Sequence, residues 1–166
     1  MRIHSFLGAA VAAFMSVPAD AAVVVSFPEP ERYSDAGDNW ELKDNLDALK
    51  RHLEQLGARY LPTSQTLTIE VLDIDLAGRP RYFPRRGLPD IRVLDGRTDW
   101  PMIKLRYTLA SEGKTIDTRE ETVSDSNYLQ RSATRPTESL YYEKRMLDEW
   151  FRARFVAPRA EAGQRR

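Results

Sequence analysis

Leucines recur every three or four positions between residues 42 and 56 of this chain, a spacing that places them on one face of a helix. They are Leu42, Leu46, Leu49, Leu53 and Leu56. Asp38 lies three residues before Glu41, the spacing of a capping box, and Gly57 stands where a helix often ends. The stripe spans only about two heptads, which favours the core face of one domain over a coiled coil. We predict a helix that begins after Asp38 and ends at Gly57.

Alternation of apolar and polar residues predicts a strand over residues 66–76, with a change of phase inside it. Apolar side chains occupy odd positions up to Val71 and even positions from Leu72 onward. Asp73 and Asp75 therefore fall on the face that was apolar before the change. Two explanations stay open: a bulge near Leu72, or a strand that leaves the helix-covered region and buries its other side.

The remaining pattern predicts further strands, a hairpin and a closing helix. The expected strands are residues 22–27, 91–94, 102–110 and 115–123, and the expected loops are 29–39, 78–88 and 125–136. The strand over 115–123 has charges on both faces, which is typical of a sheet edge. Thr137 is expected to cap a last helix that runs to Phe155. These elements predict an α+β fold: a single two-layer domain, with a mostly antiparallel sheet of about five strands and two helices packed on one face.

The first residues have the pattern of a cleavable signal peptide. Basic Arg2 precedes an apolar run over residues 6–17, and Ala19, Asp20 and Ala21 match a small-residue cleavage site. The run is too short to span a bilayer as a mature helix. We predict a signal peptide over residues 1–21, one domain over 22–157 and a flexible basic tail over 158–166. The expected product is a soluble periplasmic protein with no transmembrane segment.

Composition excludes several classes of chemistry. The chain has no cysteine, which excludes thiol catalysis and cysteine-bound metals, and His52 is the only histidine after residue 21. We expect His52 to be an exposed helix residue and expect no metal or cofactor. With 25 Lys and Arg against 25 Asp and Glu, the net charge is zero, which argues against nucleic-acid binding.

Asp73 and Asp75 are the first candidate site, because two carboxylates two residues apart on a strand project to the same side. They could act as a general acid and base, which would make the protein a hydrolase of an envelope polymer. The alternative is structural: at least one is tied to backbone amides or to an arginine, with Arg92 and Arg106 as the nearest candidates. A carboxylate tied in this way is expected to have a lowered pKa.

The second candidate site is a set of arginines near aromatic residues. The segment over residues 78–87 contains Arg79, Arg81, Arg85 and Arg86. Tyr82 and Phe83 stand between them, a composition that can bind an anionic envelope ligand. Arg106 is expected to contribute from the sheet face. The structural alternative is a solvated loop with its aromatic residues packed on the domain.

Several phrases of the sequence resemble the family known as domain of unknown function 3016. They are VVSFP at 24–28, YSDAG at 33–37, YLP at 60–62, LTIEVLDIDLAG at 67–78, WP at 100–101, NYL at 127–129 and YEK at 142–144. The resemblance implies an exported proteobacterial protein of this size and implies no activity, cofactor or catalytic residue. We predict a non-enzymatic binding or envelope accessory protein, with an unknown envelope protein or anionic ligand as its partner.

Overall fold

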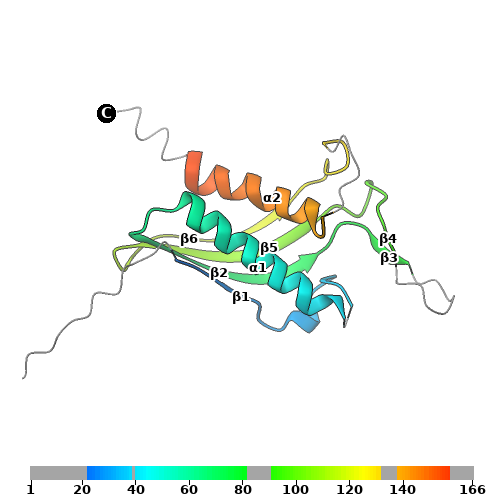
Figure 1. Ribbon diagram of the computed structural model, residues 1–166, viewed down its shortest axis with the longest axis horizontal. Helices are drawn as coiled ribbons and strands as arrows, with labels where there is room; N and C mark the ends of the chain where they lie inside the picture. Colours follow the sequence, from blue (N-terminus) through cyan, green and yellow to red (C-terminus); the bar gives the residue numbers. More distant parts are fainter. Residues whose placement is uncertain (1–21, 39, 82–90, 132–137, 158–166) are drawn as a thin grey trace, which may run out of the picture.

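A computed structural model describes residues 22–38, 40–81, 91–131 and 138–157. It has two layers: a four-stranded sheet and two helices, α1 and α2, that lie side by side on one face of the sheet (Figure 1). Both helices begin at the same end of the molecule, close to a small two-stranded ribbon. Within the described ranges, no helix is long and apolar enough to cross a membrane. The predicted α+β class with two helices on one face is confirmed.

The main sheet has the order β1-β2-β5-β6. These strands are β1 (Ala22–Ser26), β2 (Gln65–Asp75), β5 (Met102–Ser111) and β6 (Lys114–Ser124). β1 is parallel to β2, and the other pairs are antiparallel. Because β6 is last in the strand order, it forms an edge of the sheet as predicted. The register between β2 and β5 shifts between Val71 and Asp73. A bulge at Leu72 is therefore the correct explanation of the phase change.

The ribbon pairs β3 (Arg79–Arg81) with β4 (Ile91–Val93) and is separate from the main sheet. The strand at β4 was expected, but the loop predicted from residue 78 is wrong for Arg79–Arg81. The predicted fifth strand of the main sheet thus lies in the ribbon. Gly78 redirects the chain between β2 and β3 with a φ of +80°, and a Cβ on it would lie 2.7 Å from the Val93 carbonyl oxygen. Only glycine fits this turn without strain.

A short 3₁₀ turn, η1 (Pro30–Arg32), leads to α1 (Glu41–Tyr60). Leu49, Leu53 and Leu56 are buried against the sheet, which confirms the predicted core face. Asp38 caps the helix, since its Oδ1 accepts hydrogen bonds from the Trp40 and Glu41 amides.

The predicted helix end at Gly57 is wrong, because α1 continues to Tyr60. A Cβ on Gly57 would lie 2.0 Å from Cγ2 of Val23, so this glycine allows the helix to approach β1 closely. The sequence pattern thus pointed to Gly57 but gave it the wrong role, since this glycine serves packing against β1 and does not end the helix.

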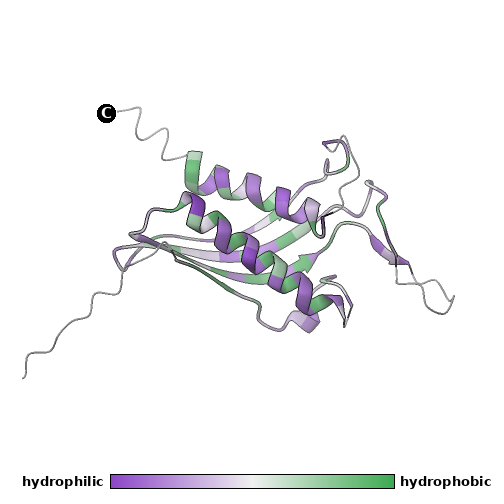
Figure 2. Ribbon diagram, viewed as in Figure 1, coloured by the Kyte–Doolittle hydropathy of each residue, from purple (hydrophilic) through white to green (hydrophobic). Residues whose placement is uncertain are grey.

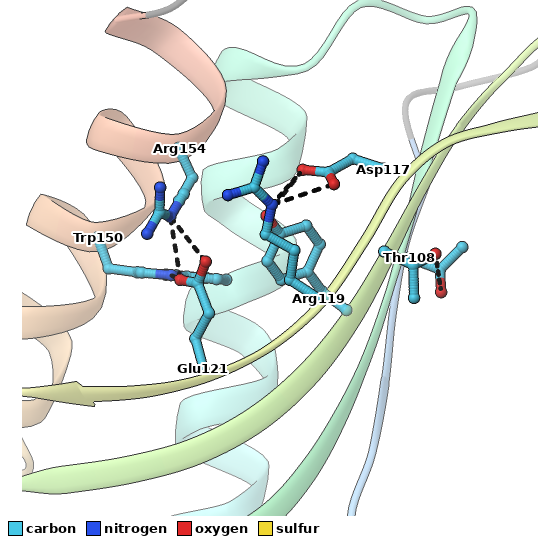
Figure 3. Close-up of polar contacts among 8 residues, drawn as sticks. Thr108, Asp117, Arg119, Glu121, Trp150 and Arg154 are labelled. Atoms are coloured by element: carbon cyan, nitrogen blue, oxygen red, sulfur yellow. Dashed lines mark hydrogen bonds and ion pairs between the residues drawn. The ribbon is translucent and has the colours of Figure 1, made fainter.

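The last helix, α2 (Tyr141–Phe151), continues into a π turn, η2 (Arg152–Val156). The predicted cap Thr137 lies outside the described residues. At its far end α2 is fixed to β6, where Glu121 accepts hydrogen bonds from Trp150 Nε1 and Arg154 Nε, each 3.0 Å (Figure 3). Phe151 is fully buried in the aromatic cluster beside this contact. We call this region the closed end of the molecule.

Hydropathy follows the two layers, with apolar positions of α1 and α2 turned toward the sheet (Figure 2). In β5 the buried side chains of Ile103, Leu105 and Tyr107 alternate with the exposed Lys104 and Arg106. The side of β5 that the helices leave open is therefore polar, whereas Val24 on β1 and Ile116 on β6 are exposed apolar side chains of the sheet.

Candidate functional site

Asp73 is bound by a single serine. Ser34 donates its backbone N–H to Asp73 Oδ1 at 2.7 Å and its hydroxyl to Oδ2 at 2.8 Å. The predicted tie to a backbone amide is confirmed for this carboxylate, whereas the suggested arginine is not its partner. Both oxygens of Asp73 are engaged, which leaves it poorly placed to act as a general acid or base.

Asp75 differs from its neighbour, since no hydrogen bond from another described residue reaches its carboxylate. Partial burial raises the pKa of Asp75, and the nearby negative charges of Asp35 and Asp73 raise it further. The lowered pKa was expected only of a carboxylate that is tied in this way, and Asp75 is not the tied member of the pair. The positive charges of Arg92 and Arg79 offset part of this rise.

Arg92 pairs with Asp35, a residue that the sequence did not single out. Arg92 Nη1 donates to Asp35 Oδ2 at 2.8 Å and Nη2 donates to Oδ1 at 3.0 Å, which is a bidentate ion pair. Asp35 is held beside β2 by its backbone, which bonds to Ile74 and Leu76. The only sequence signal for Asp35 was its place in the segment over residues 33–37, because ion pairs distant in sequence leave no periodic pattern.

Of the predicted set of arginines, the structure describes Arg79, Arg81 and Arg106, and Arg106 lies on a different sheet from the other two. Arg106 lies on the open face of the sheet, where it bonds to Glu70 at 2.7 Å and to Glu120 at 2.9 Å. Arg79 and Arg81 are exposed on β3. Arg85 and Arg86 lie outside the described residues. Contact of these arginines with an anionic ligand stays a prediction, and Arg106 is separated from the ribbon by its position on the sheet.

The segment from Leu76 to Gly78 is a junction of three other parts of the chain. The amide of Leu76 donates to the Asp35 carbonyl, that of Ala77 to Glu143 Oε1, and that of Gly78 to the Asp99 carbonyl. Arg92 also donates to the Gly78 carbonyl at 2.9 Å. Each of these three peptide groups therefore holds a different segment in place. This contact pattern is a structural role for the last three residues of the LTIEVLDIDLAG phrase.

An outer cleft of about 580 Å³ opens where both helices begin. Three acidic residues at the start of α1, Asp38, Glu41 and Asp44, form one wall. Trp40 lies at the rim and is 89% exposed, unusual for so large an apolar side chain. The Asp35–Arg92 ion pair forms another part of the lining.

An inner pocket of about 230 Å³ adjoins this cleft and shares Leu76, Arg92 and Leu140 with it. Its walls are mostly apolar or aromatic and include Tyr141 and Tyr142. We call the outer cleft and the inner pocket together the end cleft. An apolar pocket with a few polar groups is the usual form of a small-ligand site.

Glu143 is the most unusual residue of the inner pocket. It is only 3% exposed, and burial raises the pKa of its carboxyl. Oε1 accepts the Ala77 amide at 2.8 Å, and the backbone amide of Glu143 itself also bonds to the carboxyl, but no donor from another described residue reaches Oε2. The sequence indicated Glu143 only as part of a family phrase, because an acidic residue in the first turn of a helix is ordinarily exposed.

A second polar network supports the pocket from behind. Asp99 is buried and accepts hydrogen bonds from the amides of Asp95 and Gly96 and from the Tyr128 hydroxyl. Burial alone would raise the pKa of Asp99, but these hydrogen bonds lower it below its usual value. Tyr128 in turn packs edge-on against Tyr142, with ring centroids 4.8 Å apart. The tyrosine wall of the pocket is therefore held rigidly.

His52 is not the exposed helix residue that was expected. Its side chain is 17% exposed, and Nε2 lies 3.0 Å from Asp148 Oδ1 and 3.1 Å from the Lys144 carbonyl oxygen. His52 thus links α1 to α2. Across the part of the chain that the structure describes, no cluster of three or more histidine, aspartate or glutamate side chains could hold a metal ion.

Fold and site together define a class: a two-layer α+β domain with a polar cleft at the end where both helices begin. The family model described as "Protein of unknown function (DUF3016)" matches residues 21–153, and the chain belongs to this family. The predicted resemblance is confirmed.

A comparison with solved structures gives one further finding. The chain is similar to a minor lipoprotein from Acinetobacter baumannii whose crystal structure is known, with 13% sequence identity and a TM-score of 0.29. The match covers 86% of this chain and 95% of that chain. A TM-score this low does not establish a shared fold. No curated protein matches the chain.

Proposed function

We propose that the protein is exported and that its domain binds a small ligand in the end cleft without chemical turnover. The observation on which this depends is Glu143, a buried carboxyl group beside an apolar pocket that accepts only one hydrogen bond from another described residue, the Ala77 amide. A buried carboxyl group with few donors costs free energy to ionise, and a ligand that supplies a further donor lowers that cost.

Binding is better supported than hydrolysis by Asp73 and Asp75. A pair of catalytic carboxylates needs two groups that can reach a substrate. Both oxygens of Asp73 are occupied by Ser34, and Asp75 does not line the end cleft. The raised pKa of Asp75 remains the one observation in favour of acid catalysis.

Export is supported by the basic residue, apolar run and small residues of the predicted leader. The family match begins at residue 21, where that leader is expected to end. We expect the exported protein to begin within two residues of Ala22, which amino-terminal sequencing of the periplasmic fraction would measure. Recovery of Met1 from that fraction would contradict this part of the proposal.

Titration of the isotope-labelled protein with a library of small aromatic fragments, followed by two-dimensional NMR, tests binding. We expect the amide signals that shift to cluster at Ala77, Leu94 and Tyr142. Arg106→Ala is the matched control, because it removes a cation from the open sheet face and should leave these shifts unchanged. Shifts confined to the open sheet face, or no shifts at all, would refute the end cleft as a binding site.

A further inference from the structure

The end cleft has an excess of negative charge. Two of its acidic residues are paired: Asp35 with Arg92 at 2.8 Å, and Glu138 with Lys144 at 2.6 Å. The other acidic lining residues are Asp38, Glu41, Asp44 and Glu143. No ion pair joins any of these four to a cation among the described residues. Arg79 and Arg81 do not line the cleft.

Two helix amino-termini face the same region and favour the opposite sign of charge. Each contributes the equivalent of roughly half a positive elementary charge. The two together therefore offset about one of the unpaired carboxylates, even though Asp38 already serves as the cap of α1. The field in the cleft remains negative, which favours a cationic ligand over an anionic one.

The inner pocket adds an observation that does not depend on the acidic wall. Glu143 is almost fully buried, and its Oε2 has no donor from another described residue. The apolar Leu76, Leu94 and Leu140 and two tyrosine rings surround it. A cation on a bulky apolar group would satisfy both the carboxyl oxygen and these walls.

The rings of the site are of a kind that binds cations. Tyr141 and Tyr142 meet edge-on with centroids 5.4 Å apart, and Arg145 already lies over both rings at 5.7 and 5.9 Å. Trp40 presents an exposed indole at the mouth of the outer cleft. Indole and phenol faces attract ammonium groups through their quadrupoles.

We infer that the ligand of the end cleft is an organic cation: an ammonium or guanidinium group on an aromatic or branched apolar body, bound with its charge toward Glu143. This inference rests on the proposed binding function and adds the chemical class of the ligand. The cation could belong to a free amine or to a basic side chain of a peptide, and the experiment below separates these sources.

Three probes of similar shape and different charge test the inference by NMR titration of the purified protein: benzylamine, benzyl alcohol and benzoate. We expect benzylamine to bind about tenfold more tightly than benzyl alcohol, as charge-assisted hydrogen bonds are about twice as strong as neutral ones. Benzoate should bind more weakly than either. Binding of Nα-acetyl-lysinamide more tightly than benzylamine would assign the cation to a protein side chain, and the reverse order would assign it to a free amine.

Glu143→Gln is the decisive variant, because glutamine retains an oxygen for the Ala77 amide and loses the charge. It should weaken benzylamine binding about tenfold and leave benzyl alcohol binding unchanged. Glu149→Gln is the control on the same helix, since Glu149 is exposed, pairs with Arg131 and does not line the cleft. Asp44→Asn, with Asp47→Asn as its control, gives a second test at exposed positions and should weaken the amine by about twofold.

The outcomes distinguish failure of the cation inference from failure of the proposed binding function. If the three probes bind in the end cleft with equal affinity, or benzoate binds most tightly, the cation inference is wrong and the binding site stands. If amine binding is unaffected by both Glu143→Gln and Asp44→Asn, the inference is also wrong. If the probes shift only residues outside the end cleft, the proposed function fails first.

Discussion

The two ends of α2 use acidic residues in opposite ways. At the closed end, Glu121 accepts hydrogen bonds from Trp150 and Arg154 and is fully engaged. At the other end, Glu143 is more deeply buried but accepts one hydrogen bond from another described residue, the Ala77 amide. An engaged carboxylate fixes a helix to its sheet, whereas a buried one with few donors costs stability.

Aromatic residues show the same contrast. At the closed end Tyr107, Trp150 and Phe155 contact one another edge-on, and burial raises the pKa of Tyr107 to about 12. Its hydroxyl donates to Asp117 at 3.0 Å. In the end cleft, Trp40 is 89% exposed, and no ring contact joins it to another described aromatic residue. Rings that fill space and rings that are exposed should respond very differently to substitution.

Replacement of Phe151 by alanine should have the largest effect on stability. Phe151 is fully buried, and the cavity left behind should cost about 3 to 5 kcal/mol. Trp40→Ala, at the exposed rim, should change stability by less than about 0.5 kcal/mol. Urea unfolding of both variants measures the difference. Equal losses would show that the end cleft is packed as tightly as the closed end.

Arg92→Met should give the next largest effect, since it leaves the Asp35 carboxylate without its partner. We expect a loss of about 2 to 3 kcal/mol, below the value for a fully buried pair because roughly a quarter of each side chain remains exposed. Thermal unfolding measures it. Arg79→Met, on the neighbouring ribbon strand, is the control and should be close to neutral. No loss in Arg92→Met would mean that the ion pair does not hold the cleft wall.

Glu121→Gln should cost about 0.5 to 1 kcal/mol. The variant keeps an acceptor for Trp150 but loses the charge that pairs with Arg154, whose side chain is 44% exposed and therefore screened. The loss should shrink in high salt. A loss several times larger would show that the closed end depends on this charge rather than on its aromatic packing.

Glu143→Gln should mainly alter how stability depends on pH. The pKa of Glu143 is raised from its usual 4.5 in the folded state, so the folded protein keeps this proton to a higher pH than the unfolded chain. Stability therefore falls as pH rises from about 4.5 through the raised value. The variant lacks this fall, so its free energy of unfolding should rise relative to that of the wild type as the pH approaches neutral. Parallel pH profiles of the two proteins would contradict the prediction.

Local sequence patterns predicted most of the secondary structure. The leucine spacing located the buried face of α1, and the change of phase at Leu72 located the bulge. Charges on both faces identified β6 as an edge. These features follow from side-chain periods of 3.6 and 2, which can be read along the chain without knowing what lies across from it.

The end cleft could not be predicted in this way. Asp35 and Arg92 are far apart in the sequence, and Glu143 meets Ala77 only because α2 begins above the end of β2. The same reasoning chose Asp73, which proved to be bound by Ser34. Burial and pairing between distant segments decide which acidic residue is free, and neither is encoded in a local period.

The parallel pairing of β1 has a consequence for the order of folding. The β5–β6 hairpin pairs residues that are close in sequence, such as Ser111 and Lys114. Ala22 instead pairs with Thr66, which is synthesised much later. A chain that emerges with its amino-terminus first therefore presents β1 earliest and pairs it late, after α1 and β2 exist. During that interval an uncharged strand of three valines is open to other chains, and an exposed strand of this kind promotes aggregation. We therefore expect β1 to be the strand of the main sheet most open to aggregation while the chain folds.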